Sequence, residues 1–452
     1  MSLTSTAESG LANIHDSRDG KHQGCEYSAS CSGISKHTWG QYSPYFPAPS
    51  EIAPDTPKDC RVTFVQVLSR HGSRGPTASK LDTYSELVSS LQKNVQSYGE
   101  GFEFIKDYKF DLFADNLTAY GEEEMRDSGA LFYKRYRHLA HRTAPFLRAA
   151  GSPRVIESAH HFGNAFYTAQ GLEKKPDVLV IPEEPGYNNT LDRSGCPAFD
   201  TGPGGEVGAK LKKEWSEKWV PKITERLNSK LVGANLTDRD TVYLMDLCPF
   251  NTIADMDAEM SDFCKLFNQD EWHSYDYYQS LGKWYDYGPG RDLGPSTGVG
   301  FVNELLARLT GKPVDDHTST NSTLDSSPKT FPLDRKLYAD FSHDNTMIAI
   351  YAALGLFNGT KNLPADHKVP PARLGGYSTS WTVPFAARMY VEKMKCKDTP
   401  DEELVRVLVD DRVVKLFGCG ADELGRCKLS RFVESQTFAR DGGHWGDCFK
   451  QN

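Results

Sequence analysis

The chain has 452 residues and a net charge of −9, with 52 Lys and Arg against 61 Asp and Glu. That length predicts two domains, or one domain with a large insertion. Hydrophobic residues make up 38% and include 23 Phe and 21 Tyr, enough for packed cores, which excludes wholesale disorder. Proteins that coat nucleic acid are usually basic, so we expect no nucleic-acid partner, although a local basic pocket for an anionic substrate stays open. No apolar run reaches about 18 residues, so we expect no transmembrane helix and no membrane partner.

Ten cysteines and five glycosylation sequons indicate an oxidising compartment. No cysteines form a Cys-x-x-Cys pair and no His lies at zinc-finger spacing from them, so we expect five disulfides rather than a zinc site. Residues 1–24 are polar and lack a signal-peptide core. We interpret the chain as a mature secreted protein in which a start Met replaces the signal, and a cytosolic protein with ten free thiols is the alternative. The sequons begin at Asn116, Asn188, Asn235, Asn321 and Asn358.

The first half of the chain alternates between strand and helix patterns. Residues 1–35 are rich in Ser, Gly and His and predict a flexible arm. The β-branched run at 61–69 predicts a buried strand, and it leads into RHGSRGPT, where two glycines and a proline break regular structure. The pattern from 84 to 147 is helical, with a helix at 122–136 that begins in acids and ends in bases, as the helix dipole favours. A short strand at 154–157, a helix at 159–172 and a strand at 177–181 are predicted next.

The second half repeats this alternation after a helical stretch at 211–290. The pattern then predicts a helix at 299–309, a polar loop at 312–330, a strand at 336–341, a helix at 346–356 and strands at 387–391 and 404–409. Such alternation predicts an α/β fold, with a large α/β domain around a mostly parallel central sheet and a smaller inserted helical domain. We assign residues 36–84, 151–210 and 291–452 to the α/β domain, and residues 85–150 and 211–290 to the helical domain.

Two predicted strands end in chemically distinctive residues. The first is followed by Arg70, His71 and Arg74 in a glycine loop, where guanidinium groups match phosphate oxygens and the glycines let backbone approach them. The second is followed by His343 and Asp344, a base beside a carboxylate. Open α/β sheets bind ligands at the carboxyl ends of their strands, so we expect both segments, with Arg154 as a third element, to form one anion site. Surface salt bridges are the alternative, and for an isolated arginine such as Arg154 they are the more common reading.

The motif RHGSRGP, together with SHDN downstream, resembles the histidine acid phosphatases. From about residue 25 to 448 the chain is similar to the fungal secreted 3-phytases, in segments such as WGQY, RVTFVQVLSRHG, YLMDLCPF, LYADFSHDN and LGRC. The chain departs from the common RHGARYPT pattern of that family at Ser73 and Gly75. This departure bears on the breadth of substrates rather than on the class of reaction.

The resemblance implies a role for each matching residue. His71 would attack phosphorus and carry the phosphoryl group, and Asp344 would protonate the leaving oxygen and later activate water. Arg70, Arg74, Arg154 and His343 would bind the phosphate oxygens. The residues that would line the substrate pocket are Gln41, Tyr42, Thr77, Lys80, Asp192 and Lys283. Taken from the residues alone, Gln41, Tyr42 and Lys80 read as ordinary loop residues, and the two lysines as solvated surface groups.

The resemblance also implies the disulfide pairing, since ten cysteines alone leave the connectivity open. The implied pairs are Cys25–Cys31, Cys60–Cys396, Cys196–Cys448, Cys248–Cys264 and Cys419–Cys427.

The function implied is that of a secreted, monomeric phosphomonoesterase acting on myo-inositol hexakisphosphate (phytate), without a cofactor or metal. The nearest alternative is a broad-specificity acid phosphatase with the same mechanism. A non-enzymatic, anion-binding secreted glycoprotein is a further alternative, disfavoured because both nucleophile and proton donor are present. Ser73 is not in a serine-hydrolase elbow, because His71 stands where that motif needs glycine. The adjacent His160 and His161 point in different directions on a helix and do not predict a metal site.

Overall fold

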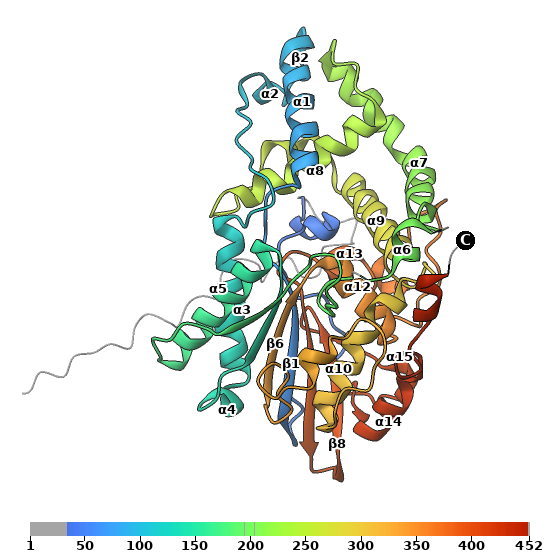
Figure 1. The fold of residues 1–452 in the computed structure, drawn as a ribbon. Helices are drawn as coiled ribbons and strands as arrows, with labels where there is room; N and C mark the ends of the chain where they lie inside the picture. The colour runs from blue at the N-terminus through green and yellow to red at the C-terminus, as the bar shows by residue number, and fades with distance from the viewer. Residues whose placement is uncertain (1–33, 194, 203, 451–452) are drawn as a thin grey trace, which may run out of the picture.

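The computed structural model describes residues 34–450 except 194 and 203. The predicted Cys25–Cys31 bridge and most of the predicted arm at 1–35 lie outside the described residues. A large sheet forms the lower part of the molecule and a group of helices stands above it (Figure 1). The fold is therefore α/β, as the sequence predicts.

The sheet has the strand order β10-β8-β7-β1-β6-β3-β4, with β9 pairing β8. The half formed by β1, β6, β3 and β4 is parallel, and the half from β7 onward is antiparallel. The strands are β1 (Cys60–Arg70), β3 (Phe146–Ala150), β4 (Val178–Ile181), β6 (Leu337–Ser342), β7 (Arg388–Cys396), β8 (Thr399–Val409), β9 (Arg412–Val414) and β10 (Cys427–Lys428). The central strands β1 and β6 are buried on both faces, as their β-branched and apolar sequences predict.

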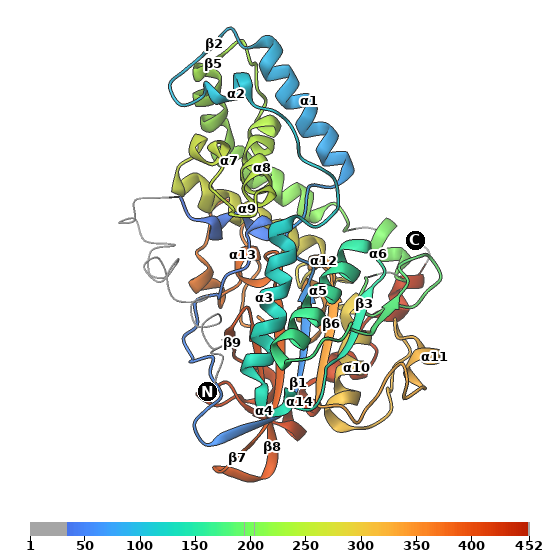
Figure 2. The same cartoon turned by 90° about the vertical axis from the view of Figure 1, so that its left-hand side faces the viewer.

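Helices cover both faces of this sheet. α3 and α5 lie together on one face, and α10, α12 and α14 lie on the other (Figures 1 and 2). Their bounds are α3 (Ala119–Arg135), α5 (Pro153–Gln170), α10 (Val299–Thr310), α12 (Asp344–Ala353) and α14 (Leu429–Ser435). Shorter helices near the sheet are α4 (Arg137–Ala140), α6 (Pro197–Thr201), α11 (Ser322–Asp325), α13 (Thr379–Thr382) and α15 (Thr437–Arg440).

The helices above the sheet have a hydrophobic core of their own. They are α1 (Ala78–Asn94), α2 (Phe104–Asp107), α7 (Val207–Lys230), α8 (Asp238–Ala254) and the first half of α9 (Gln269–Asp286), with a two-stranded sheet of β2 (Ser97–Tyr98) and β5 (Leu231–Val232). The second half of α9 packs into the core of the sheet through Tyr277, Leu281 and Trp284. α9 thus belongs to both cores and connects the two parts of the molecule, as does α7, with Trp215 in the core of the sheet and Val220 in the core of the helices.

Two sequence predictions are wrong in detail. Residues 154–157 form the first turn of α5 and not a strand, because Pro153 at the first helical position favours a helix start after Ser152. β3 begins inside the stretch predicted to be helical, which ends at 147, and its sequence FLRAA lacks the β-branched residues that mark a strand. Met125 and Phe132 of α3 pack in the core of the sheet. Residues 119–150, assigned from sequence to the helical domain, therefore pack with the sheet.

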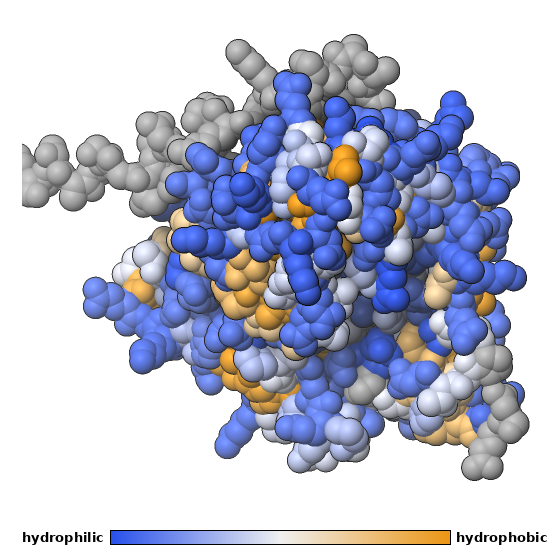
Figure 3. All heavy atoms as spheres, turned by 90° about the horizontal axis from the view of Figure 1, so that it is seen from above, coloured by the Kyte–Doolittle hydropathy of each residue, from blue (hydrophilic) through white to orange (hydrophobic). Residues whose placement is uncertain are grey.

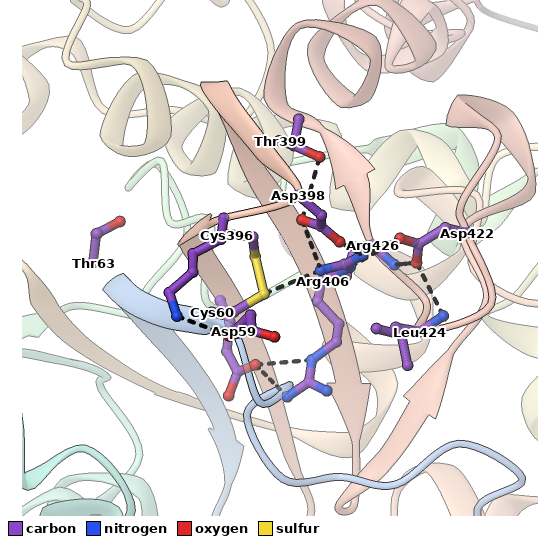
Figure 4. The surroundings of a disulfide bond; sticks show 12 residues. Asp59, Cys60, Thr63, Cys396, Asp398, Thr399, Arg406, Asp422, Leu424 and Arg426 are labelled. Atoms are coloured by element: carbon purple, nitrogen blue, oxygen red, sulfur yellow. Dashed lines mark hydrogen bonds and ion pairs between the residues drawn. A yellow bond between two sulfur atoms is a disulfide. The ribbon is translucent and has the colours of Figure 1, made fainter.

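Four of the implied disulfides are present: Cys60–Cys396, Cys196–Cys448, Cys248–Cys264 and Cys419–Cys427. Cys60–Cys396 joins the start of β1 to the end of β7 (Figure 4). Beside it, Arg426 donates a hydrogen bond to Sγ of Cys60 and forms ion pairs with Asp398 and Asp422. Among the described helices, none is long and apolar enough to span a membrane.

Candidate active site

The candidate site lies where β1 and β6 end side by side. The parallel register pairs Arg70 with Ser342, so the next residues, His71 and His343, emerge at the same edge of the sheet. The centroids of their rings are 5.8 Å apart. The two motifs, separated by more than 260 residues of sequence, are therefore brought together as predicted.

Close backbone packing holds the loop after β1. The amide of Ser73 donates to Oε2 of Glu124 at 2.8 Å, and the amide of Gly72 donates to Oγ of Ser158 at 3.1 Å. A Cβ atom at Gly75 would collide with the carbonyl oxygen of Phe113. A side chain at position 75 would therefore require the backbone at Phe113 to move.

His71 is buried, with 1% of its surface exposed. Its Nδ1 lies 2.9 Å from the carbonyl oxygen of Gly72. Because a carbonyl only accepts, Nδ1 carries the hydrogen and Nε2 of the neutral ring keeps its lone pair. Burial, followed by the charges of Arg70, Arg74 and Arg154, holds the pKa of His71 well below its ordinary value. His71 is a neutral imidazole with a free nitrogen at the end of the sheet.

Three arginines surround this imidazole. They differ in how many of their donors already form hydrogen bonds or ion pairs within the protein. Arg70 is buried, donates to the carbonyl oxygens of Gln41 and Val383, and pairs with Oδ2 of Asp344 at 3.1 Å. Among the described residues, Arg74 forms no ion pair, and Arg154 forms one with Asp115 alone, at 3.9 Å. The Nε atoms of Arg74 and Arg154 are buried without a hydrogen-bond partner among the described residues. These two arginines are the ones available to an anion.

Asp344, at the start of α12, is held by two cations. Its Oδ2 lies 3.1 Å from Nη2 of Arg70 and 2.9 Å from Nζ of Lys283, which also donates to Asn345. Burial by itself raises the pKa of Asp344, but the charges of Arg70 and Lys283 outweigh it and hold the pKa well below its ordinary value. Asp344 is an ionised carboxylate in this arrangement. Lys283 is buried, so the alternative reading of it as a solvated surface lysine is wrong.

His343 is oriented by a carboxylate that the sequence did not single out. Its Nε2 lies 2.9 Å from Oε1 of Glu183, and Glu183 also accepts from the amide and hydroxyl of Ser152. Burial raises the pKa of Glu183, but the hydrogen bonds from His343 and Ser152 lower it to about 2. Asp192 completes this cluster, and burial and the charge of Glu183 raise its pKa. Asp192 was predicted to line the pocket, and its carboxylate lies within 4.8 Å of the side chains of Glu183 and His343.

The remaining predicted pocket residues lie between the sheet and the helices above it. Gln41 is buried and contributes its carbonyl to Arg70, while its side-chain amide donates to Gln279. Tyr42 is buried under the ammonium group of Lys80, 5.4 Å from its ring centroid. Nζ of Lys80 lies 2.7 Å from Oδ2 of the buried Asp246, a pairing that raises the pKa of Lys80 against the effect of burial. Thr77 is the N-cap residue of α1 and makes no side-chain capping bond.

A further lysine, Lys212 on α7, was missed in the sequence. Its Nζ lies 4.3 Å from the ring centroid of Tyr278, and its side chain crosses Gly282 on α9. Burial, with the nearby charge of Lys80, lowers the pKa of Lys212, against the attraction of Asp286. Lys80, Lys212 and Lys283 therefore form a row of cations between α1, α7 and α9. The face of the molecule above this region is mostly hydrophilic, with small, separate hydrophobic patches (Figure 3).

The predicted glycosylation sequons lie largely at the surface. Asn116, Asn188, Asn235 and Asn358 are exposed. Asn321 is partly buried and its side chain accepts from the amide of Leu324 as the N-cap of α11. The attachment of glycans stays a prediction.

A neutral histidine surrounded by three arginines lies at the carboxyl ends of parallel strands. This arrangement is suited to binding a phosphoryl group and is typical of α/β phosphoryl-binding proteins. The model of the "Histidine phosphatase superfamily (branch 2)" matches residues 61–410, and the chain belongs to this family. It is 51% identical over 423 residues to Phytase A of Emericella nidulans, covering 91% of this chain and 90% of that one. It is 48% identical over 430 residues to Phytase A of Aspergillus fumigatus, covering 93% and 92%.

Solved structures agree on the fold. The phytase from D. castellii has a TM-score of 0.77 at 21% identity and covers 92% of this chain and 88% of its own. A multiple inositol polyphosphate phosphatase of Bifidobacterium longum, in complex with inositol hexasulfate, has a TM-score of 0.63 at 16% identity and covers 90% and 100%.

Proposed function

We propose that the protein hydrolyses phosphate monoesters, with phytate as its preferred substrate, through a phosphohistidine intermediate on His71. The observation that carries this proposal is the neutral, buried imidazole whose free Nε2 lies among Arg70, Arg74 and Arg154. Membership of the histidine phosphatase superfamily supports the reaction, and relatives named Phytase A support the substrate.

In the first step the lone pair on Nε2 of His71 forms a bond to phosphorus as the bond from phosphorus to the alcohol oxygen breaks. Arg74 and Arg154 bind the non-bridging oxygens, since their donors are the least committed to the protein. Arg70 at the end of β1 and His343 after β6 bind the same oxygens. Hydrogen bonds to Val383 and Glu183 hold these two side chains in place.

Asp344 supplies the proton to the leaving oxygen and recovers it from the attacking water in the second step. This role requires a protonated carboxyl, whereas Arg70 and Lys283 keep it ionised in the absence of substrate. A bound phosphate dianion competes for both cations and adds negative charge nearby, and each effect raises the pKa of Asp344. Substrate binding thereby prepares the acid that cleavage needs.

The row of Lys80, Lys212 and Lys283 is suited to the phosphates that are not being cleaved. A net charge of −9 repels a polyanion from the molecule as a whole, so the pocket needs local cations to reverse the field. Gln41, Tyr42, Thr77 and Asp192 complete the proposed pocket.

The direct test measures phosphate release from phytate and from p-nitrophenyl phosphate by the purified protein. We expect kcat/KM to be higher for phytate and His71→Ala to abolish both activities. A higher value for p-nitrophenyl phosphate favours the broad-specificity acid phosphatase. If neither substrate releases phosphate, the result favours the alternative of a non-enzymatic, anion-binding glycoprotein.

The proposal includes no metal. Glu183, Asp192 and His343 could hold a cation, but Glu183 already accepts from His343 and Ser152. We expect EDTA to leave the release of phosphate unchanged, and loss of activity that Zn²⁺ or Mg²⁺ restores would contradict this.

We propose further that the chain acts as a secreted monomer. Four disulfides support an oxidising compartment. Size-exclusion chromatography with light scattering tests the monomer, for which a mass of about 50 kDa per particle is expected before glycans are counted.

A further inference from the structure

A second basic pocket lies at the end of the sheet opposite to the candidate active site. It has a volume of about 550 Å³ and opens between the start of β1, the segment before β6, and β7. Ten residues of extended strand separate Arg61 in this pocket from His71, about 33 Å at 3.3 Å per residue. The two sites are therefore distinct.

Cations dominate the lining of this pocket. Arg61, Arg335, Lys336 and Lys395 are exposed at its rim, and none of them forms a salt bridge with a described residue. Lys393 lies deeper and is paired with Glu403 at 3.2 Å. With Arg308 the lining holds six cations against two acids, Asp334 and Glu403, in a chain whose net charge is −9.

Arg308 is a buried, charged residue in the lining of this pocket. It is 2% exposed and its Nη1 pairs with Oδ2 of Asp340 at 2.7 Å. Its Nε and Nη2 have no hydrogen-bond partner among the described residues. The guanidinium carbon lies 4.7 Å from the ring centroid of Phe331 and 4.4 Å from that of Tyr338, so aromatic rings contact this group and its positive charge adds to the field of the pocket.

The sheet itself holds like charges together at this place. The register of β1 and β7 puts Arg61 directly opposite Lys395, an arrangement that destabilises a strand pair. The adjacent pair in the register is Cys60 and Cys396, whose disulfide fixes the two strands beside the repelling cations. An anion bound between Arg61 and Lys395 would relieve the repulsion.

We propose that this pocket is a second anion site, which binds a small ligand carrying several phosphate or sulfate groups. The volume lies in the range of small-molecule sites, and a concave pocket suits a compact polyanion better than a polymer. Four unpaired cations on three segments call for more than one anionic group on the ligand. The proposal does not depend on the function proposed above.

The test is calorimetric titration with myo-inositol hexakissulfate, which carries six sulfate groups. We compare the parent protein with the variant Arg61→Gln, Arg335→Gln, Lys336→Gln and Lys395→Gln. A matched control replaces four exposed lysines of the helical part, Lys93, Lys106, Lys218 and Lys222, by Gln. The parent and the control should bind one molecule more per chain than the pocket variant, and each single pocket substitution should weaken that event about two- to five-fold.

An equal number of bound molecules in the parent and the pocket variant overturns the proposal. Phosphate release at the active site should be the same in all three proteins, which also shows that the variants fold. If the active site does not bind the probe, the parent shows a single event that the pocket variant loses, so a failure of the proposed function is separable from a failure of this site. Without ligand, the pocket variant should unfold at a higher temperature than the parent, because the Arg61–Lys395 repulsion is gone.

Discussion

At His71, burial and the neighbouring arginines act in the same direction and favour the neutral imidazole. Burial is the larger of the two causes. A free imidazole is mostly protonated below pH 6.5, but His71 should stay neutral and nucleophilic well into the acid range.

We therefore expect phosphate release from p-nitrophenyl phosphate to persist at about pH 5. The measurement is the pH dependence of kcat/KM. A rate that declines with an apparent pKa near 6.5 would mean that His71 titrates like a free imidazole and would contradict the assignment.

Asp344 is the second residue whose role can be isolated by substitution. Asp344→Asn should reduce turnover of phytate by about 10²–10⁴-fold, because the inositol alkoxide needs a proton to leave. Formation of the intermediate from p-nitrophenyl phosphate should fall far less, because nitrophenolate leaves without a proton. Pre-steady-state release measures both, with His71→Ala as the control that loses both activities. Equal losses on the two substrates would move the proton donor elsewhere, first to His343.

Lys283 was expected on the rim of the pocket, yet it contacts Asp344 and Asn345. Because Lys283 positions Asp344, Lys283→Ala should lower kcat for phytate by about 10-fold or more, the usual effect of losing a hydrogen bond to a charged group. It should lower kcat far less for p-nitrophenyl phosphate, whose leaving group needs no proton. Lys93→Ala, an exposed lysine on α1, is the control and should have no effect. A change confined to KM for phytate would return Lys283 to the rim.

At the scale of elements, the sequence was most informative where hydrophobicity and motif coincide. β1 and β6 are recognisable from their β-branched and apolar runs, and each is followed by its motif. β3 was missed because its burial between β6 and β4 comes from tertiary pairing, which its own residues do not signal. Glu124 and Glu183 were missed for a related reason. Each acts through hydrogen bonds with residues far along the chain, and no local pattern marks such contacts.

The bridge between β1 and β7 offers a test at this scale. Replacing Cys60 and Cys396 together by Ser should lower the free energy of unfolding by about 2–5 kcal/mol, because the unfolded chain gains a long open loop. Chemical denaturation under non-reducing conditions measures the loss. The double variant Cys419→Ser and Cys427→Ser, which opens a loop of 8 residues, is the comparison and should cost less. Equal losses would show that loop length is not the cause.

At the scale of the whole molecule, a buried ionic network ties the sheet to α10. Asp340 on β6 accepts from Arg148 on β3 and Arg308 on α10, and Arg148 also pairs with Glu304. Asp340→Asn removes the charge that neutralises two buried guanidinium groups and should cost about 3–5 kcal/mol of stability. Asp401→Asn, on an exposed part of β8, is the control and should stay within about 0.5 kcal/mol.

The same variant predicts a dependence on pH. Burial raises the pKa of Asp340, but Arg148 and Arg308 outweigh it, and the pKa lies below its ordinary value of 3.8. A lowered pKa gives stability that is complete above the ordinary value and is lost as the pH falls toward the folded value. The difference in stability between parent and Asp340→Asn should therefore narrow below pH 3.8. A difference that stays constant in acid would assign the cost to packing instead.

The pattern of the two longest disulfides has a topological consequence. Cys60–Cys396 spans 336 residues and Cys196–Cys448 spans 252, and the two spans overlap. A protease that cuts any one peptide bond between residues 60 and 448 therefore leaves both fragments covalently joined. Two cuts are needed to release a piece from this part of the chain, and a single nick becomes visible only after reduction. A first cut between residues 60 and 448 therefore releases no part of the protein.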